Sequence, residues 1–399
     1  MTGQLTSGFG LVLMIGLAWL LSAHRWRVDW RLVTIGVLVQ FAIAWSLLKT
    51  SLGLDVINRV RTIFELLLAC TDDGAEFAFG PNFRDHYFAF KIGATIISFG
   101  ALMGLLYHFR ILQFVVGVLG WFMQRTLGTS GAESLVAAAN IFTGQTEAPL
   151  IIQPYLARMT RSEIMTLMVA GFATVAGGVM AAFIGMGIDA GHLLTASVIS
   201  APAAVVIAKI LQPEVDEPVT RNTLGAAVKP DTINAFDALT TGAADGLRLA
   251  LNITAMVIAF LALVAVVDLA LTSATGVFGS PWTLADVFGW VFSPLAWAMG
   301  VDPGDERKVG ELLGLKTVAN EFLAYDRLAT MQDLGPRSKV IAVYALCGFA
   351  NLGSVGVQIG GLSLLAPSRR ADFATLGWRA MLGGNLACFM TACIAGLLI

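Results

Sequence analysis

Residues 161–178 read RSEIMTLMVAGFATVAGG, and residues 337–354 read RSKVIAVYALCGFANLGS. Each copy follows a stretch that carries an acidic residue in apolar surroundings, Glu147 in the first case and Glu321 in the second. An internal duplication of this kind predicts that the chain is built from two copies of one structural unit. With one residue inserted in the second copy, the quartet Gly171, Phe172, Ala173 and Thr174 aligns with Gly348, Phe349, Ala350 and Asn351.

The composition of the whole chain is that of a membrane protein. Apolar residues make up 57% of the 399 residues, charged residues only 13%, and the mean hydropathy is +0.77. This charged share is about half that of a soluble domain, so most of the chain is expected to be surrounded by the lipid bilayer. The net charge of −2 gives no basic surface that would indicate a nucleic-acid partner.

Apolar stretches of about 20 residues recur along the chain and predict an all-α polytopic membrane protein, because lipid offers a spanning segment no hydrogen-bond partners outside its own helix. Three further stretches have intermediate polarity and are expected to lie as amphipathic helices at the interface, at 52–80, 111–128 and 283–300. The hydrophilic stretch 213–240 predicts a surface loop. Eight transmembrane helices are expected, at residues 8–23, 32–48, 88–107, 164–186, 193–211, 247–271, 339–365 and 376–398.

Two segments, 131–158 and 309–335, are long enough for a helical hairpin but carry acids and turn residues at their middles. We interpret both as re-entrant hairpins that enter and leave the membrane on one side. The first is expected to open to the inside and the second to the outside. The two units of a hairpin plus two spans are then inverted copies, an arrangement that builds a substrate site at the bilayer midplane.

The expected spans also give a topology. The first ten residues lack the positive region of a cleavable signal peptide, so the apolar run 9–23 is expected to remain as the first span. Eight spans bring the two termini to one side, and the basic connector with Arg25, Arg27 and Arg31 lies on the other. The positive-inside rule then places both termini of this multi-pass protein outside.

Four regions follow from this layout. Residues 1–128 hold scaffold and interfacial helices, and residues 129–212 hold the first transport repeat of a re-entrant hairpin plus two spans. Residues 213–300 are expected to form a cytoplasmic loop, a long scaffold helix and an interfacial helix, and residues 301–399 the second transport repeat.

The first hairpin carries a polar string, NIFTGQTEAP at residues 140–149, in the middle of apolar flanks. A carboxylate near the bilayer centre costs roughly 2.5–3.5 kcal/mol, so Glu147 requires water, a partner or a ligand. The second hairpin carries Asn320 and Glu321. The structural alternative for the first string is that Gln145 and Glu147 only cap the hairpin tip.

The second copy of the repeat interrupts an apolar span with GFANLGS at residues 348–354. Its glycines permit local unwinding, and Asn351 and Ser354 are three residues apart and share a helix face. Hydrogen bonding between helices is the alternative role for these two. The strings supply acids, amides and hydroxyls but no Arg or Lys at the presumed midplane, which favours a neutral, polyhydroxylated solute over an anion.

The cysteines and histidines do not indicate a metal or cofactor. Both residue types are scattered, without the paired spacing of a zinc site or a disulfide framework. We therefore expect no cofactor and no enzyme, since no nucleophile and base pair accompanies the two acids. Two rival functions remain open: an intramembrane enzyme that uses Glu147 and Glu321 as general acid and base, and a passive channel.

Several of these strings together resemble the signature segments of the concentrative nucleoside transporter family. The matching segments occur in family order and run from about residue 90 to the C-terminus, and the short N-terminal region is similar to that of bacterial members. The strings are GQTEAPL at 144–150, GFATVAGG at 171–178, NEF at 320–322, GFANLGS at 348–354 and GGNLACFMTACIAGL at 383–397.

This resemblance implies a role for each matching residue. Five residues would face the nucleobase of a substrate such as uridine, cytidine or adenosine, and three would hold the ribose hydroxyls. The resemblance also implies a homotrimer in which outer spans form a static scaffold around a moving transport domain. The nucleobase set is Gln145, Thr146, Glu147, Val179 and Phe349, and the ribose set is Glu321, Asn351 and Ser354.

The resemblance further implies sodium as the coupling ion, bound by the side chains of Asn140 and Thr174 and the backbone carbonyls of Thr143 and Val175. Proton coupling remains the alternative, because some bacterial relatives use protons and carry Gly-Gln-Ser-Glu where this chain has Gly-Gln-Thr-Glu. Either cation offsets the charge of the site carboxylates, so cation and nucleoside raise each other's affinity. The function implied is cation-coupled symport of nucleosides into the cell.

Overall fold

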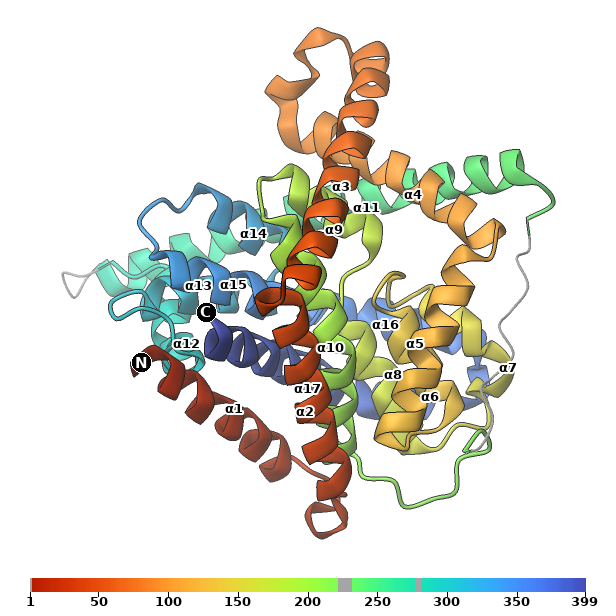
Figure 1. The fold of residues 1–399 in the computed structure, drawn as a ribbon. Helices are drawn as coiled ribbons and strands as arrows, with labels where there is room; N and C mark the ends of the chain where they lie inside the picture. The colour runs from red at the N-terminus through yellow and green to blue at the C-terminus, as the bar shows by residue number, and fades with distance from the viewer. Residues whose placement is uncertain (1, 222–231, 277–280) are drawn as a thin grey trace.

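The computed structural model describes residues 2–221, 232–276 and 281–399, and every regular element in these ranges is helical (Figure 1). Within these described ranges, seven helical segments are long and apolar enough to cross a membrane. This confirms the all-α polytopic fold. The segments are α1 (Thr2–Leu20), α2 (Trp30–Lys49), α4 (Gly93–His108), the broken pair α8 (Arg161–Ala173) and α9 (Gly177–Gly185), α10 (Ala190–Leu211), α11 (Ala235–Gly276) and α17 (Arg370–Leu398).

The helices repeat in the same order in the two halves of the chain. In each half, an interfacial helix leads into a hairpin, then a broken helix, then a long helix. The first set is α5 (Ile111–Leu127), the hairpin of α6 (Gly131–Ala139), η4 (Ala148–Ile152) and α7 (Gln153–Leu156), then α8, α9 and α10. The second set is α12 (Leu284–Met299), the hairpin of α13 (Glu306–Val318) and α14 (Glu321–Thr330), then α15 (Pro336–Leu346), α16 (Leu352–Leu365) and α17.

Three expected elements differ in the structure. The spans expected at 164–186 and 339–365 each consist of two shorter helices, α8 with α9 and α15 with α16, because the chain leaves the helix at 174–176 and at 347–351. The loop expected at 213–240 ends earlier, since α11 already begins at Ala235, twelve residues before the expected span. Part of that expected loop, 222–231, lies outside the described residues.

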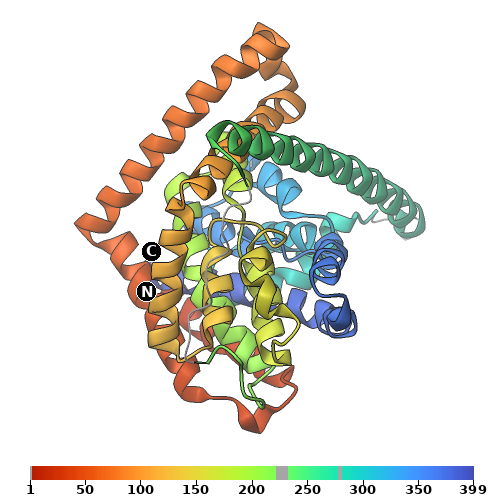
Figure 2. The same ribbon diagram turned by 90° about the vertical axis from the view of Figure 1, so that its right-hand side faces the viewer.

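The helices form a buried core and a periphery. In the most apolar windows of α10 and α17, 89% of the residues are buried, compared with 11% for α11. Helices α8, α10, α15 and α17 pack against one another, and α1 and α2 cover them. Figure 2 shows α11 and α3 (Ser51–Phe79) as long helices at the edge of the molecule. The repeat therefore forms the core, as its apolar sequence predicts.

Helices α4 and α11 form a closely packed pair at the periphery. Each carries two glycines four residues apart, Gly100 and Gly104 in α4 and Gly242 and Gly246 in α11, and these glycines face each other. A methyl group at Gly100 would lie only 2.6 Å from the Gly242 carbonyl oxygen. Small residues at this spacing allow two backbones to approach closely, which is how helices associate in lipid.

The two ends of the described chain lie side by side (Figure 1). The side-chain amide of Gln4 donates a hydrogen bond of 3.2 Å to the carbonyl oxygen of Ile399. This agrees with a topology in which both termini lie on one side, whereas the side of the membrane that they occupy stays a prediction.

The glycine contact between α4 and α11 generates a test of stability. We expect Gly100→Ala to lower the melting temperature of the purified protein, at a cost of about 1–3 kcal/mol, because its new methyl group meets backbone that cannot rotate away. The matched control is Gly93→Ala in the same helix, where nothing lies within 4 Å. The control should be neutral or slightly stabilising, since alanine favours helices. Equal melting temperatures for both variants would contradict the packing argument.

Candidate functional site

The breaks in the two core helices meet at the centre of the molecule. Helix α8 stops at Ala173, and α15 stops at Leu346. Between them, a Cβ atom at Gly348 would lie 2.6 Å from the carbonyl oxygen of Phe172, and Gly348 has a positive φ of 152°. Only glycine tolerates both this conformation and this contact. The glycine that begins GFANLGS is therefore required where the two repeats touch.

The carbonyl groups released at the end of α15 are bound by side chains from other elements. Lys316 of α13 donates to the Ala345 oxygen at 2.9 Å, and Tyr325 of α14 donates to the Val343 oxygen at 2.8 Å. From α17, Asn385 donates to the Ala350 oxygen at 3.0 Å and Cys388 to the Cys347 oxygen at 3.0 Å. Buried backbone groups need such partners, so the break is built into the surrounding helices.

Lys316 corrects an expectation from the sequence. We expected no Arg or Lys at the depth of the site, yet the Lys316 side chain is completely buried in the second hairpin. Its ammonium group lies at the carbonyl end of α15, where a cation is favoured, and it interacts electrostatically with the Glu321 carboxylate. It does not line the cavity described next, so it leaves the preference for a neutral solute unchanged.

A cavity of about 250 Å³ lies where the two hairpins and the two breaks converge. All eight residues that the sequence assigned to a substrate line it, from elements far apart in the chain. Four residues of α11 complete its wall and were not foreseen: Leu249, Asn252, Ile253 and Met256. Only Asn252, a lone amide in an apolar stretch, gave a signal in the sequence. The eight expected residues are Gln145, Thr146, Glu147, Val179, Glu321, Phe349, Asn351 and Ser354.

Three helices begin at this cavity. The residues that precede α9, α14 and α16 are Ala176, Asn320 and Asn351, and all three line it. Helix N-termini present free N–H groups and a partial positive charge. Such helix ends favour a carboxylate or the oxygen atoms of a ligand. Glu321 is the first residue of α14, so its carboxylate lies at one of these ends.

Glu321 and Asn351 are joined inside the cavity. The Asn351 amide nitrogen donates to the Glu321 carboxylate at 2.9 Å, while the Asn351 amide oxygen accepts from the Ser354 N–H at 2.8 Å. Asn351 therefore caps the N-terminus of α16. The three-residue spacing had predicted instead that Asn351 and Ser354 share a helix face. All three residues are buried. The pair combines a charged acceptor with an amide, a set that suits neighbouring hydroxyl groups.

The polar string of the first hairpin forms a non-helical turn between α6 and η4. The Gln145 side chain is buried, and its amide oxygen has no hydrogen-bond partner among the described residues. Buried acceptors of this kind are uncommon and require an explanation such as a ligand or a water. Glu147, in contrast, is exposed to the cavity.

The four residues expected to bind a cation lie at the carbonyl ends of two helices. Asn140 ends α6 and Thr174 ends α8, and the Gly177 N–H donates to the Phe142 oxygen at 2.8 Å between the two turns. The Asn140 amide oxygen is buried without a hydrogen-bond partner in the described part of the chain. Thr143 and Val175, whose carbonyls complete the expected set, are also buried. Helix C-termini and unwound carbonyls are where cations bind in such folds.

A buried polar network anchors the foot of the first hairpin. Lys209 of α10 lies 2.7 Å from the Glu133 carboxylate of α6, and Ser130 joins Glu133 to Glu163 of α8. Because these charges are buried, each needs its partners. The network fixes α6 to α8 and α10, so the turn that carries Gln145 and Glu147 has a rigid base.

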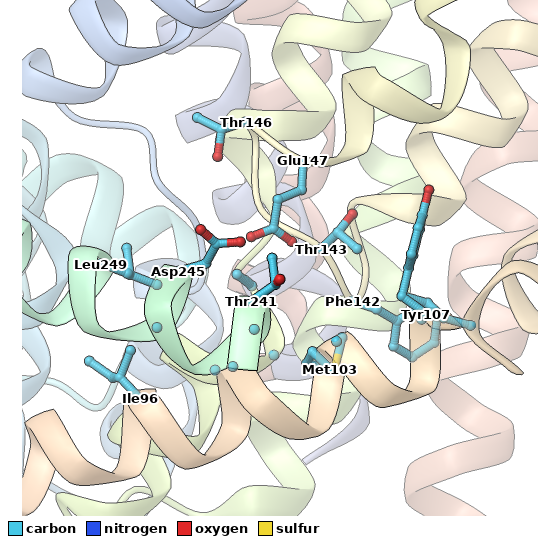
Figure 3. Close-up of a pocket in the computed structure, with 18 of the residues that line it drawn as sticks. Ile96, Met103, Tyr107, Phe142, Thr143, Thr146, Glu147, Thr241, Asp245 and Leu249 are labelled. Atoms are coloured by element: carbon cyan, nitrogen blue, oxygen red, sulfur yellow. The ribbon is translucent and has the colours of Figure 1, made fainter. Parts of the chain in front are cut away.

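A second, larger cavity of about 530 Å³ adjoins the first (Figure 3). It lies between the first hairpin and the α4–α11 pair. Figure 3 shows the carboxyl groups of Glu147 and Asp245 pointing toward one another across it. Glu147, Thr146, Leu249 and Asn252 line both cavities, so the two spaces meet at these residues.

Three family models match successive parts of the chain. The description "Na+ dependent nucleoside transporter" applies to the N-terminal match at residues 9–82 and the C-terminal match at residues 192–396. A third model, described as "Nucleoside recognition", matches residues 89–190. Together these matches reach from the first span to nearly the end of the chain.

The chain is also similar to individual proteins. It is 44% identical to solute carrier family 28 member 3 of Rattus norvegicus, over 99% of this chain and 59% of that protein, so the chain spans about three-fifths of this relative's length. It is 40% identical to an uncharacterized transporter of Haemophilus influenzae, over 99% of this chain and 98% of that protein. Among solved structures, CNTnw in an inward-facing substrate-bound state matches with a TM-score of 0.92 and 38% identity, covering 98% of this chain and 97% of that chain.

The position of Lys316 generates a prediction for the site. We expect Lys316→Met to lower the melting temperature, because it leaves the Ala345 carbonyl without a donor, at a cost of about 1–3 kcal/mol. The control is Lys308→Met in the same helix, which removes ion pairs to Asp305 and Asp333 near the surface and a solvent-exposed hydrogen bond to the Asp333 carbonyl oxygen. Such pairs contribute only about 0–1 kcal/mol. A melting temperature for Lys316→Met that equals or exceeds that of the control would refute the capping role.

Proposed function

Because the chain belongs to the family of sodium-dependent, concentrative nucleoside transporters, we propose that it carries nucleosides into the cell together with sodium ions. The observation that carries the proposal is the convergence of all eight expected substrate residues on one cavity of about 250 Å³. These residues come from both hairpins and both broken helices. The family to which the chain belongs consists of transporters, so an enzyme is excluded.

We assign the nucleobase to the side of the cavity formed by the first hairpin. Gln145 and Thr146 supply amide and hydroxyl groups, Glu147 supplies an acceptor, and the apolar Val179 and Phe349 pack against the ring. The buried, unpartnered oxygen of Gln145 supports this assignment, since a base with N–H groups would satisfy it. The bases of uridine, cytidine and adenosine all carry N–H groups that could donate to this oxygen.

We assign the ribose to Glu321, Asn351 and Ser354. The carboxylate accepts hydroxyl protons, while the amide and hydroxyl groups both donate and accept. The support for this assignment is the 2.9 Å hydrogen bond between Asn351 and Glu321, which fixes the two side chains relative to each other. Preorganised groups of this kind lose little freedom on binding.

We propose that sodium binds beside the nucleobase side of the cavity, at Asn140, Thr143, Thr174 and Val175. The unpartnered Asn140 oxygen and the two helix C-termini support a cation there. Sodium entering down a membrane potential of 100 mV contributes about 2.3 kcal/mol per charge, which is roughly fifty-fold accumulation. Proton coupling through Glu147 or Glu321 is the alternative.

We further propose alternating access, in which the core carries the cavity past a fixed α4–α11 pair. The contrast in burial supports this division, since α10 and α17 are enclosed while α11 faces outward. The exposed α11 fits contact with other copies of the chain in a homotrimer. We further place the protein in the bacterial inner membrane with both termini in the periplasm, as the positive-inside rule predicts. A passive channel would show no uphill accumulation and no dependence on a cation gradient.

The proposed coupling predicts sodium-driven uptake. In proteoliposomes we expect radiolabelled uridine to accumulate transiently above equilibrium under a sodium gradient and not under a proton gradient alone. Asn140→Ala should raise the sodium concentration for half-maximal uptake at least about tenfold, because a cation loses one oxygen ligand. The control, Asn58→Ala, changes an exposed residue of α3. Uptake driven by protons alone would favour the alternative coupling, and uptake that only equilibrates would favour a channel.

The ribose assignment predicts the effect of two substitutions. Glu321→Gln and Asn351→Ala should each lower uridine uptake at least about tenfold without loss of membrane insertion, since hydrogen bonds to charged groups contribute about 1.5–3 kcal/mol. Glu311→Gln is the matched control, because Glu311 lies in the same hairpin but pairs with Arg327 outside the cavity.

The substrate offers a complementary readout. In competition with uridine, 3′-deoxyuridine should bind more weakly than cytidine or adenosine, because the ribose side loses a hydrogen bond. Near-normal uptake by both variants, or equal competition by the three competing nucleosides, would contradict the ribose assignment.

A further inference from the structure

Helix α11 carries a polar stripe that the proposed site does not use. Thr241, Asp245, Arg248 and Asn252 follow one another at spacings of four, three and four residues. These spacings place all four on one face of the helix, over a length of roughly 16 Å. The stripe lies on a peripheral helix that is otherwise largely apolar at its exposed positions. Arg248 and Asn252 lie within the span expected at 247–271, where polar side chains are costly and therefore indicate a function.

All four residues of the stripe line the larger cavity, and Asn252 also lines the smaller one. Met103 and Tyr107 of the adjoining helix α4 extend the wall that the stripe forms, and the opposite wall includes Glu147 and Phe142 from the first hairpin (Figure 3). The larger cavity thus combines a hydrogen-bonding wall with apolar and aromatic side chains. It begins where the smaller cavity ends, at Glu147, and its volume of about 530 Å³ exceeds that of the smaller cavity.

We propose that this cavity is a second, transient binding site for the transported nucleoside, with Asp245 and Thr241 as the residues that hold its hydroxyl groups. The inference rests on the proposed function of the chain. The nucleoside moves from the smaller cavity along the stripe of α11, with Asn252 as the stripe residue that lines both cavities. Its base packs against Met103, Phe142 and Tyr107.

The charges of the larger cavity favour a neutral ligand that both donates and accepts hydrogen bonds. Asp245 and Arg248 form an ion pair at 3.2 Å, so their charges offset each other. The remaining carboxylate of Glu147 disfavours an anion. Thr241, Asn252 and Tyr107 add hydroxyl and amide groups, which a hydroxylated solute can use and a simple ion cannot use fully.

This second site acts on the rate of transport. Without it, a nucleoside that leaves the smaller cavity would exchange its hydrogen bonds for the apolar side chains of α4 and α11. A line of polar side chains replaces those bonds step by step, which lowers the barrier to movement without strengthening the first site. Asp245 and Thr241 are thus expected to determine turnover and selectivity among polar solutes.

The first test compares variants along α11. We expect Asp245→Ala to lower the maximal rate of uridine uptake about tenfold and Thr241→Val to lower it less, because an uncharged hydrogen bond is weaker. Equilibrium binding of uridine to the purified protein should stay within about twofold. The controls are Asp237→Ala and Thr240→Val, at positions of α11 outside both cavities, and both should transport at the normal rate.

Three results would overturn the inference. They are unchanged rates in both variants, an equal loss of rate in the controls, and a shift confined to the sodium concentration for half-maximal uptake. The last would assign Asp245 to the cation. If the unaltered protein shows no uridine uptake at all, the proposed function fails instead, so the two failures are distinguishable.

A second test does not depend on transport by the variants. Cys70 is the only exposed cysteine among the described residues, so Cys70→Ser removes the background for thiol labelling. In that background, Thr241→Cys is combined with Glu321→Gln to weaken the first site. We expect millimolar uridine still to slow labelling of the new thiol several-fold. Protection that requires intact Glu321 would show that the larger cavity has no binding site of its own.

Discussion

Backbone carbonyl groups that lose their helical partners inside the bilayer need new donors, and much of the core is arranged to supply them. Where α15 stops, the donors are Lys316 and Tyr325 of the second hairpin and Asn385 and Cys388 of α17. These bonds tie the hairpin, the broken helix and the last helix into one body. The unwound segment can therefore persist at membrane depth, and its polar side chains remain directed into a cavity.

The broken helices also sort the ligands by charge. Helices α9, α14 and α16 begin at the smaller cavity, and their partial positive charge suits the oxygen atoms of a hydroxylated solute. Helices α6 and α8 end beside it, and their partial negative charge suits a cation. In the proposed function, the cation and the solute would thus occupy neighbouring positions defined by opposite helix ends. Their close approach gives a physical basis for coupling, since each ligand offsets the charge arrangement that the other meets.

The paired helices α4 and α11 stand apart from this core. Their glycine contact makes them one unit, and α11 presents to the core a face that carries both apolar residues and the polar stripe from Thr241 to Asn252. The wall of the smaller cavity is therefore formed partly by the core and partly by α11 of the α4–α11 pair. Relative movement of the two units would change the wall while Glu321, Asn351 and Gln145 keep their mutual geometry.

The sequence by itself determined the helical membrane fold and the two repeats, and its resemblance to a transporter family implied eight of the residues that line the smaller cavity. Apolar length, internal repetition and the high cost of polar groups in lipid are local properties that can be read along a chain. The tertiary structure alone decided the role of Lys316, the contribution of Asn252 and Met256, and the position of Asp245 opposite Glu147. Each of these depends on contacts between segments distant in sequence. A lysine in a hairpin becomes a helix cap, and an aspartate on a peripheral helix lines a cavity, only through the packing of other helices around it.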